Sequence, residues 1–210
     1  MSTTRRETLH RTPDAMSAMR QARVAICGCG ALGANLADTL ARMGFAHLTL
    51  IDQDRVEEHN LSTQPFGLRE VGQLKAQMMA NALYRGLGVE AQAHAVSMGV
   101  KNASGLLQGH DVIVDAFDNS VSRKLVQHTA SQLGIPCLHM GMAAGYSEVI
   151  WDPTYKVPSD AGVDQCDYPL GRTLVTTTVS LGAELLTRFV ARGQMDSVSW
   201  TMEDFRAHPV

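Results

Sequence analysis

Short apolar runs alternate along most of the chain with longer stretches in which apolar residues recur at helical spacing. The runs predict strands at 23–27, 47–51, 89–96, 111–115 and 135–140. The helical spacing predicts helices over 31–43, 71–85 and 121–133, with a short helix end near 106–108. Brief apolar strands separated by helices are typical of a mostly parallel sheet covered on both faces. The pattern therefore predicts the α/β class.

The C-terminal part departs from this alternation. The apolar run Tyr146–Trp151 follows the preceding strand too closely for a parallel crossover, so we expect an antiparallel hairpin there. Residues 152–172 are rich in proline and glycine and predict an irregular segment. A helix over 173–191 has an apolar surface wide enough for a core or a subunit interface, and a last strand is predicted at 198–202. These elements form a C-terminal antiparallel extension of the sheet.

The pattern also suggests how the chain is divided. Residues 1–21 form an N-terminal arm followed by a short helix. Residues 1–12 are polar and predicted to be mobile unless a partner orders them, and Asp14 can cap the helix. Residues 22–150 form the α/β core. Residues 151–210 complete the same domain with the irregular segment, the long helix and the last strand.

A glycine-rich turn joins the first predicted strand to the first core helix. Gly28, Gly30 and Gly33 fit G-x-G-x-x-G, in which the first glycine allows a tight turn, the second lets a phosphate approach and the third lets helix pack on strand. The unpaired N–H groups at the start of the helix, including those of Ala31 and Leu32, then face the phosphates. The sequence therefore predicts a Rossmann-like nucleotide site.

Other polar residues follow the predicted strands. Asp52 ends the second strand, 19 residues after the last glycine, where a ribose-binding acid is expected. Lys75 near a helix start can neutralise phosphate, and Asn60 and Gln64 can donate to phosphate oxygens. Asp118 lies just beyond the fourth strand, where a carboxylate suits Mg²⁺ held together with substrate phosphates. Several residues also have structural interpretations, as turn former, solvated charge, helix cap or ion-pair partner: Asp54, Asn60, Lys75, Asn119 and Arg123, the last paired with Asp115 or Asp118.

Three motifs in fixed order carry a family resemblance. They are D-x-D-x-V-x-x-x-N-L-x-x-Q over 52–64, G-x-x-K-A over 72–76 and D-x-x-D-N-x-x-x-R over 115–123. Together with the glycine turn, this order resembles the ThiF/MoeB/HesA family of ubiquitin-activating-enzyme-like adenylyltransferases. The resemblance covers roughly residues 22–150 and extends weakly over 151–192. The chain resembles a short member of that family that lacks its two C-x-x-C zinc pairs.

The resemblance implies an activity and a site. A substrate carboxylate attacks the α-phosphate of ATP, giving an acyl adenylate and pyrophosphate, with Mg²⁺ as the metal. The substrate is the C-terminal glycine of a ubiquitin-like or sulfur-carrier protein, or a small-molecule acid, and the enzyme is expected to be a homodimer. The implied catalytic residues are Lys75, Asp118 and Arg123, with Asp118 as the metal ligand and Arg123 supporting it or contacting the acyl donor. The implied nucleotide-binding residues are Gly28, Gly30, Ala31, Leu32, Gly33, Asp52, Asp54, Asn60, Gln64, Lys75, Asp115 and Asn119.

The chain departs from the family at two arginines. Thr63 takes the place of the arginine in N-L-x-R-Q, and an N-terminal arginine motif that reaches the partner subunit is not recognisable, although Arg5, Arg6 and Arg11 lie upstream. Cys166 stands where some relatives carry a cysteine that receives the activated group, but flanking aspartates would raise its pKa. Two other classes stay open. One is an NAD-dependent oxidoreductase, for which the glycine turn and Asp52 would suffice, and the other is a catalytically inactive nucleotide-binding scaffold, which Thr63 and the missing N-terminal motif favour.

Composition and charge limit the partners and the cellular location that we expect for this protein. A net charge of −3 over 210 residues gives no reason to expect nucleic acid or a membrane surface as partner. We expect no membrane span, since no apolar run approaches the roughly 20 residues that one requires. The start of the chain has no apolar secretory core, and the four cysteines do not form a disulfide pattern, so we expect a cytoplasmic protein.

Overall fold

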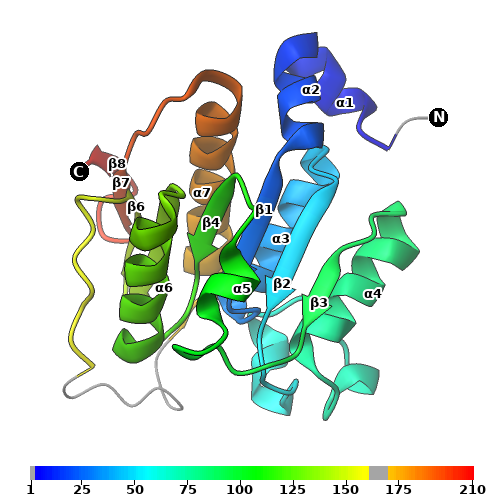
Figure 1. Cartoon of the computed structure of the whole chain (residues 1–210), viewed down its shortest axis with the longest axis vertical. Helices are drawn as coiled ribbons and strands as arrows, with labels where there is room; N and C mark the ends of the chain where they lie inside the picture. Colours follow the sequence, from blue (N-terminus) through cyan, green and yellow to red (C-terminus); the bar gives the residue numbers. More distant parts are fainter. Residues whose placement is uncertain (1–2, 161–169) are drawn as a thin grey trace.

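A computed structural model describes residues 3–160 and 170–210, and the structural statements below concern these residues. They contain one eight-stranded sheet in the order β3-β2-β1-β4-β5-β6-β7-β8. Strands β1 to β5 run parallel, and β6, β7 and β8 are antiparallel additions at one edge, as predicted (Figure 1). The strands are β1 Arg23–Cys27, β2 His47–Ile51, β3 Gln92–His94, β4 Val112–Asp115, β5 Cys137–Ala143, β6 Tyr146–Trp151, β7 Val198–Thr201 and β8 Ala207–Pro209.

Helices cover both faces of the sheet. They are α1 Arg5–His10, α2 Pro13–Gln21, α3 Ala31–Met43, α4 Lys75–Leu87, α5 Ala103–Leu107, α6 Ser120–Leu133 and α7 Arg172–Arg192, with 3₁₀ turns η1 Glu58–Ser62 and η2 Leu68–Glu70. The alternation of strand side chains decides which helices pack where. Val24 and Ile26 of β1 belong to the core under α2, α3, α4 and α7, whereas Ala25 and Cys27 face α5 and α6. We call the second side the α6 face.

Most predicted elements are confirmed, and the bounds of β1, α3, β2 and β6 match the prediction. The helix predicted from residue 71 begins instead at Lys75, because Gly72 adopts a φ of +84° and Leu74 forms a bridge with Arg55. The positive φ of Gly72 and the bridge between Leu74 and Arg55 keep residues 71–74 out of the helix. The pattern also missed β8, which has three exposed residues and no apolar signal.

The N-terminal segment corrects the expectation of a mobile arm. Residues 5–10 form helix α1, and the Arg11 guanidinium donates to Glu7 and to Glu184 of α7, both at 2.8 Å. Helix α2 is capped by Thr12, whose hydroxyl accepts from the Ala15 N–H at 3.3 Å, and not by Asp14. These contacts hold the segment against α7.

We expected no stretch long and apolar enough to span a membrane, but helix α7 is long and apolar enough to do so. Its 21 residues make it, in the part of the chain that the structure describes, the one helix that could cross a membrane by length and composition. Half of its most apolar window is buried within the molecule, where it packs against α2, α3, β5 and β6. Burial of this kind is typical of a core helix.

Candidate nucleotide site

The glycine turn between β1 and α3 has the geometry that its motif predicts. Gly28 has a φ of +95°, and a Cβ there would lie 2.9 Å from the carbonyl oxygen of Ala116. A Cβ on Gly33 would lie 1.8 Å from the carbonyl oxygen of Gly28, so helix and turn touch at this point. A Cβ on Gly30 would meet nothing within 4 Å. The turn is therefore closed at its first and third glycines and open at its second, where a ligand can approach.

The start of α3 offers unpaired donors beside that open glycine. The first helical hydrogen bond runs from the Ala34 N–H to the Gly30 carbonyl at 3.1 Å. The N–H groups of Ala31, Leu32 and Gly33 precede this bond and have no intrahelical acceptor. The first turn carries no acidic residue. These features make the helix start suited to an anion, and phosphate binding there stays a prediction.

Asp52 ties the glycine turn to the loop after β2. Its carboxylate accepts the N–H of Cys29 at 2.5 Å and that of Asp54 at 2.7 Å, and the residue is 6% exposed. Burial raises the pKa of this carboxyl above its ordinary value, against the opposing effect of the two hydrogen bonds. Each carboxylate oxygen can accept a further hydrogen bond, so the predicted ribose contact is chemically possible.

Lys75 reaches the same end of the sheet from the start of α4. Its Nζ lies 3.5 Å from a carboxylate oxygen of Asp54, and its backbone N–H donates to the Asp54 carbonyl at 2.9 Å. The ammonium also interacts electrostatically with Asp52 and Cys29, which belong to the glycine turn and its anchor. The side chain is only 10% exposed. The fold thus brings a partly buried cation to the glycine turn from more than forty residues away.

The two amides of the loop after β2 differ in how they are used. Asn60 caps η1, since its Oδ1 accepts the Glu57 N–H at 2.9 Å, which confirms the turn-former interpretation. Its Nδ2 is on the other side of the amide and can still donate. Gln64 is 8% exposed, and its Oε1 is buried with no hydrogen-bond partner among the residues that the structure describes. A buried amide in this state suits a polar ligand.

Asp118 lies in the loop that follows β4, next to the glycine turn. The loop touches the turn through Ala116, whose N–H donates to the Cys27 carbonyl at 2.8 Å. The Asp118 side chain is exposed and accepts from Asn119 Nδ2 at 3.3 Å. Asn119 itself caps α6, because its Oδ1 accepts the Ser122 N–H at 2.8 Å. An exposed carboxylate at the carboxyl end of a parallel strand is placed where such sheets bind ligands.

Asp115 and Arg123 lie instead in a buried network on the α6 face. Arg123 donates to Tyr155 Oη at 2.8 Å and to the Met140 carbonyl at 2.9 Å, and its guanidinium is 3.6 Å from Asp115. Asp115 is fully buried and also bonds His139 at 2.8 Å. The structure therefore pairs Arg123 with Asp115, one of the two structural interpretations. Their predicted contacts with nucleotide or acyl donor stay predictions.

His139 is a functional candidate that the sequence did not reveal. It lies within the strand β5, fully buried, and stacks on the Tyr155 ring with centroids 3.9 Å apart. The sequence separates it from its partners Asp115 and Asp152, and no histidine spacing marks it. The predicted thiol Cys166 lies outside the described residues, whereas Cys27, Cys29 and Cys137 are buried and free.

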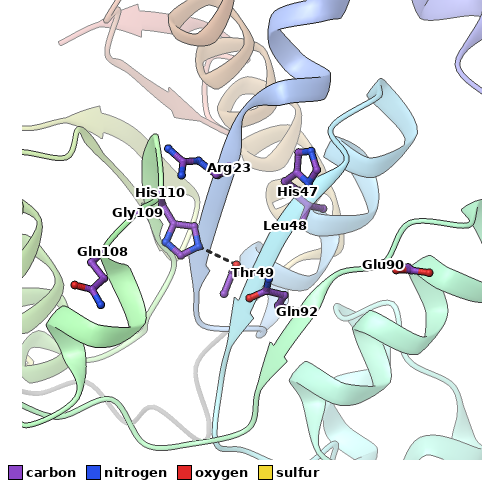
Figure 2. Close-up of a pocket in the computed structure, with 9 residues that line it drawn as sticks. All are labelled: Arg23, His47, Leu48, Thr49, Glu90, Gln92, Gln108, Gly109 and His110. Atoms are coloured by element: carbon purple, nitrogen blue, oxygen red, sulfur yellow. Dashed lines mark hydrogen bonds between the residues drawn. The ribbon is translucent and has the colours of Figure 1, made fainter.

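A cavity of about 280 Å³ lies at the opposite end of the sheet, where the parallel strands begin. It is lined by polar side chains of β1, β2, β3 and the turn before β4, including His110, whose Nε2 lies 2.8 Å from Thr49 Oγ1 (Figure 2). Helices α1 and α2 are at this end as well (Figure 1). Arg11 is engaged there with Glu7 and Glu184, while Arg5 and Arg6 are exposed on α1.

Known proteins share both sequence and fold with this chain. It is 38% identical over 117 residues to the adenylyltransferase and sulfurtransferase MOCS3 of Mus musculus, covering 55% of this chain and 25% of that protein. It is 35% identical over 130 residues to the SAMP-activating enzyme E1 of Haloferax volcanii, covering 60% and 48%. The sulfur carrier protein adenylyltransferase of Thermus thermophilus is 32% identical over 127 residues, covering 59% and 46%. The chain thus spans between a quarter and a half of the length of these relatives.

Solved structures agree at the level of the fold. The E. coli MccB structure with succinimide superposes with a TM-score of 0.82 at 18% identity, covering all of this chain and 70% of MccB. The MccB structure with ATP gives 0.79 at 18% identity, covering 94% and 65%. A model of the ThiF family matches residues 5–180, which include the glycine turn, Lys75 and Asp118. The chain therefore belongs to the ThiF family.

Proposed function

We propose that this chain is an ATP-dependent adenylyltransferase that activates a carboxylate as an acyl adenylate. The observation that carries the proposal is the meeting of three elements at one helix start. The open side of Gly30, the anchored carboxylate of Asp52 and the partly buried ammonium of Lys75 all lie at the turn between β1 and α3. Family membership supports this chemistry over that of an NAD-dependent oxidoreductase.

In this proposal, different residues bind the phosphates, the ribose and the magnesium ion of ATP–Mg²⁺. The N–H groups at the start of α3 bind phosphate oxygens, Lys75 neutralises phosphate charge and Asp52 accepts from the ribose hydroxyls. Asp118 is exposed beside the glycine turn and fits a magnesium ion shared with the phosphates. When bound, Mg²⁺ would offset the charge that develops on the phosphates. Catalysis then depends on positioning the attacking carboxylate and on stabilising charge.

The proposal also names the molecule whose carboxylate receives the adenylyl group. Relatives named for a sulfur carrier protein and for SAMP activation favour the C-terminal carboxylate of a small carrier protein, and a small-molecule acid is the second candidate. A homodimer and a cytoplasmic location are predictions that accompany this assignment. Thr63 is a specific observation in favour of an inactive scaffold, since it places an uncharged side chain where the family has an arginine.

Exchange of labelled pyrophosphate into ATP tests the proposal. We expect exchange that depends on Mg²⁺ and on an added carboxylate, with Asp118→Ala slowing it by about 10²–10³-fold, as removal of one charge-stabilising group does. Asp14→Ala, an exposed carboxylate in the first turn of α2, is the matched control and should exchange at the unmodified rate. Binding of ATP–Mg²⁺ without exchange for any carrier protein or acid would indicate a scaffold. Tighter binding of NAD than of ATP–Mg²⁺ in titration calorimetry would overturn the assignment.

A further inference from the structure

A second group of polar side chains lies on the α6 face, and the proposed adenylation does not use it. Cys137 and His139 are two residues apart on β5, so both side chains point to the same face of the sheet. Leu138 of β5 pairs with Trp151 of β6, and the next residue, Asp152, donates its N–H to the Cys137 carbonyl at 3.1 Å. The strand register thus brings a thiol, an imidazole and a carboxylate together from both strands of the hairpin.

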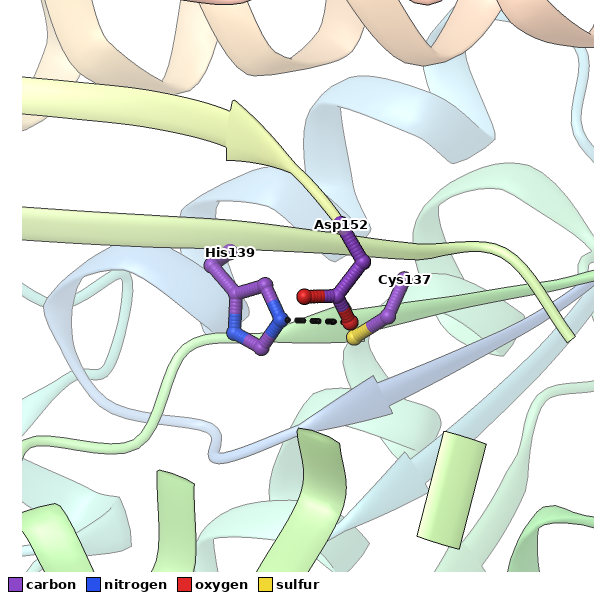
Figure 3. Close-up of side chains that lie close together, drawn as sticks. All are labelled: Cys137, His139 and Asp152. Carbon is purple, nitrogen blue, oxygen red and sulfur yellow. Dashed lines mark hydrogen bonds and ion pairs between the residues drawn. The ribbon is translucent and has the colours of Figure 1, made fainter. Parts of the chain in front are cut away.

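The donor atoms of the three side chains converge on one point. The Cys137 Sγ, a ring nitrogen of His139 and a carboxylate oxygen of Asp152 all lie within 4.8 Å of one another (Figure 3). His139 Nε2 and Asp152 Oδ2 are 3.2 Å apart. Nitrogen and oxygen ligands about 2.0 Å from a tetrahedral ion are about 3.3 Å apart, so this pair already has the required separation. The sulfur lies within 4.8 Å of both atoms.

Each of two candidate ligands is held by a partner that leaves the converging atom available. The Asp115 carboxylate accepts from His139 Nδ1 at 2.8 Å, which directs Nε2 toward Asp152. Gln127 Nε2 donates to Asp152 Oδ1 at 2.8 Å, which leaves Oδ2 for the site. A carboxylate behind a histidine and a donor behind a carboxylate are the outer contacts that orient metal ligands in proteins.

The group is closed on the sheet side and open on one other side. Cys137 and His139 are fully buried, whereas the Asp152 side chain is 22% exposed. Asp152 and Gln127 also line a cavity of about 400 Å³ between the C-terminal half of α6 and the start of β5. Asp152 therefore connects the group to this cavity.

We propose that Cys137, His139 and Asp152 form a zinc site with three protein ligands and a fourth position that faces this cavity. Sulfur, imidazole and carboxylate in tetrahedral arrangement are ligands that select Zn²⁺ among the common biological cations. Binding releases the Cys137 thiol proton and the His139 Nε2 proton to solvent and leaves His139 neutral, with its remaining proton on Nδ1. The ion then fastens the end of β6 to β5. This site does not depend on the proposed adenylation.

In the metal-free protein the side chains of this group interact with neighbouring polar groups. Burial raises the pKa of the Cys137 thiol well above its ordinary value, and the charge of Asp115 raises it further. Burial lowers the pKa of His139, but its hydrogen bonds to Asp115 and Asp152 outweigh burial and raise that pKa overall. Without metal, the thiol therefore keeps its proton, and His139 lies between the carboxylates of Asp115 and Asp152.

Cobalt(II) substitution tests the site directly. The full chain is stripped with a chelator, titrated with Co²⁺ and followed by absorption, and then displaced with Zn²⁺. We expect one equivalent of Co²⁺ to give a tetrahedral d–d spectrum with a thiolate-to-cobalt charge-transfer band. We also expect Zn²⁺ at a hundredfold excess over its Kd to raise the Tm by about 5–10 °C. Absence of stoichiometric Co²⁺ or Zn²⁺ binding would overturn the proposal.

Variants identify the ligands. Cys137→Ser should remove the charge-transfer band, and Asp152→Asn should weaken Co²⁺ binding by at least about 10-fold, because a metal ligand is lost. Gln127→Ala, which removes only an orienting contact, should weaken binding by about 10-fold with the band retained. Cys27→Ser and Cys166→Ser are the matched thiol controls and should keep the band. A band that survives Cys137→Ser, or that disappears in either control, would contradict the assignment, and Cys137→Ala gives a second variant should the serine fail to fold.

Discussion

Two carboxylates three residues apart in the D-x-x-D motif have opposite environments. Asp115 ends β4, is fully buried and is bonded to His139 with Arg123 nearby. Asp118 lies in the loop beyond, is exposed and has Asn119 as its described side-chain partner. The first carboxylate belongs to the packing of the α6 face, and the second to the open end of the sheet. Two residues of one motif can therefore have different roles, with Asp115 stabilising the fold and Asp118 free to bind a ligand.

The difference extends to the groups around them. At the glycine turn, donors and charges are left free or only partly paired, as for the α3 N–H groups, Lys75 and Gln64. Around Asp115 the polar atoms bond one another, and burial raises the pKa of Tyr155 to about 12, so the phenol keeps its proton. Unpaired groups favour ligand binding, whereas mutually satisfied buried groups favour rigidity.

The largest effect on stability is expected at Asp115. Asp115→Asn leaves the Arg123 guanidinium and His139 buried beside a neutral amide, and removal of one member of a buried pair costs about 3–5 kcal/mol. Urea denaturation of the metal-free protein measures the change. Asp118→Asn, the exposed carboxylate of the same motif, should change the free energy of unfolding by less than about 0.5 kcal/mol. Equal losses in both variants would remove the distinction between the two carboxylates.

An intermediate effect separates two glycines of the turn. Gly30→Ala adds a Cβ in open space, so we expect little change in stability but ATP affinity at least about 10-fold weaker, because a methyl group occupies the phosphate approach. Gly33→Ala forces a Cβ against the Gly28 carbonyl and should cost about 1–3 kcal/mol of stability. Calorimetric titration with ATP–Mg²⁺ and thermal unfolding measure the two effects. Unchanged ATP affinity in Gly30→Ala would show that phosphate does not bind at this turn.

The smallest effect is expected at the ion pair between Arg11 and Glu184, a partly exposed counterpart of the buried network. Burial raises the pKa of Glu184, but hydrogen bonds from Arg11 and Arg188 outweigh it and lower that pKa overall. The folded state thus gains stability from the ionised carboxylate above its unfolded pKa, and this gain is lost as pH falls through the lowered folded pKa.

Glu184→Gln should therefore cost about 0.5 kcal/mol at pH 7, in keeping with the 40% exposure of the side chain, and less at pH 3. Chemical denaturation at the two pH values measures the difference. Arg42→Gln, which breaks an exposed pair within α3, is the control for a pair that joins no two elements. A cost for Glu184→Gln that grows toward acid pH would contradict the sign of this linkage.

The sequence alone determined the α/β class, the order of the elements and the glycine turn. These depend on local periodicity and on backbone requirements that residues such as Gly28 and Gly33 record directly. It also marked Lys75 and Asp118, because their motifs keep fixed spacing from the strands. Local patterns missed α1 and β8, whose residues bury little apolar surface and form because other segments hold them.

Tertiary structure alone decided which polar residues meet. Nothing in the spacing of Asp115, His139 and Asp152 indicates that they form one chain of hydrogen bonds, because the register between β4, β5 and β6 sets their distance. The same register places Cys137 beside Asp152, and Arg123 of α6 donates to the Met140 carbonyl of β5 with its guanidinium 3.6 Å from Asp115. Contacts across a sheet depend on the pairing of distant strands, and that pairing is fixed by burial of the whole core and not by any local pattern.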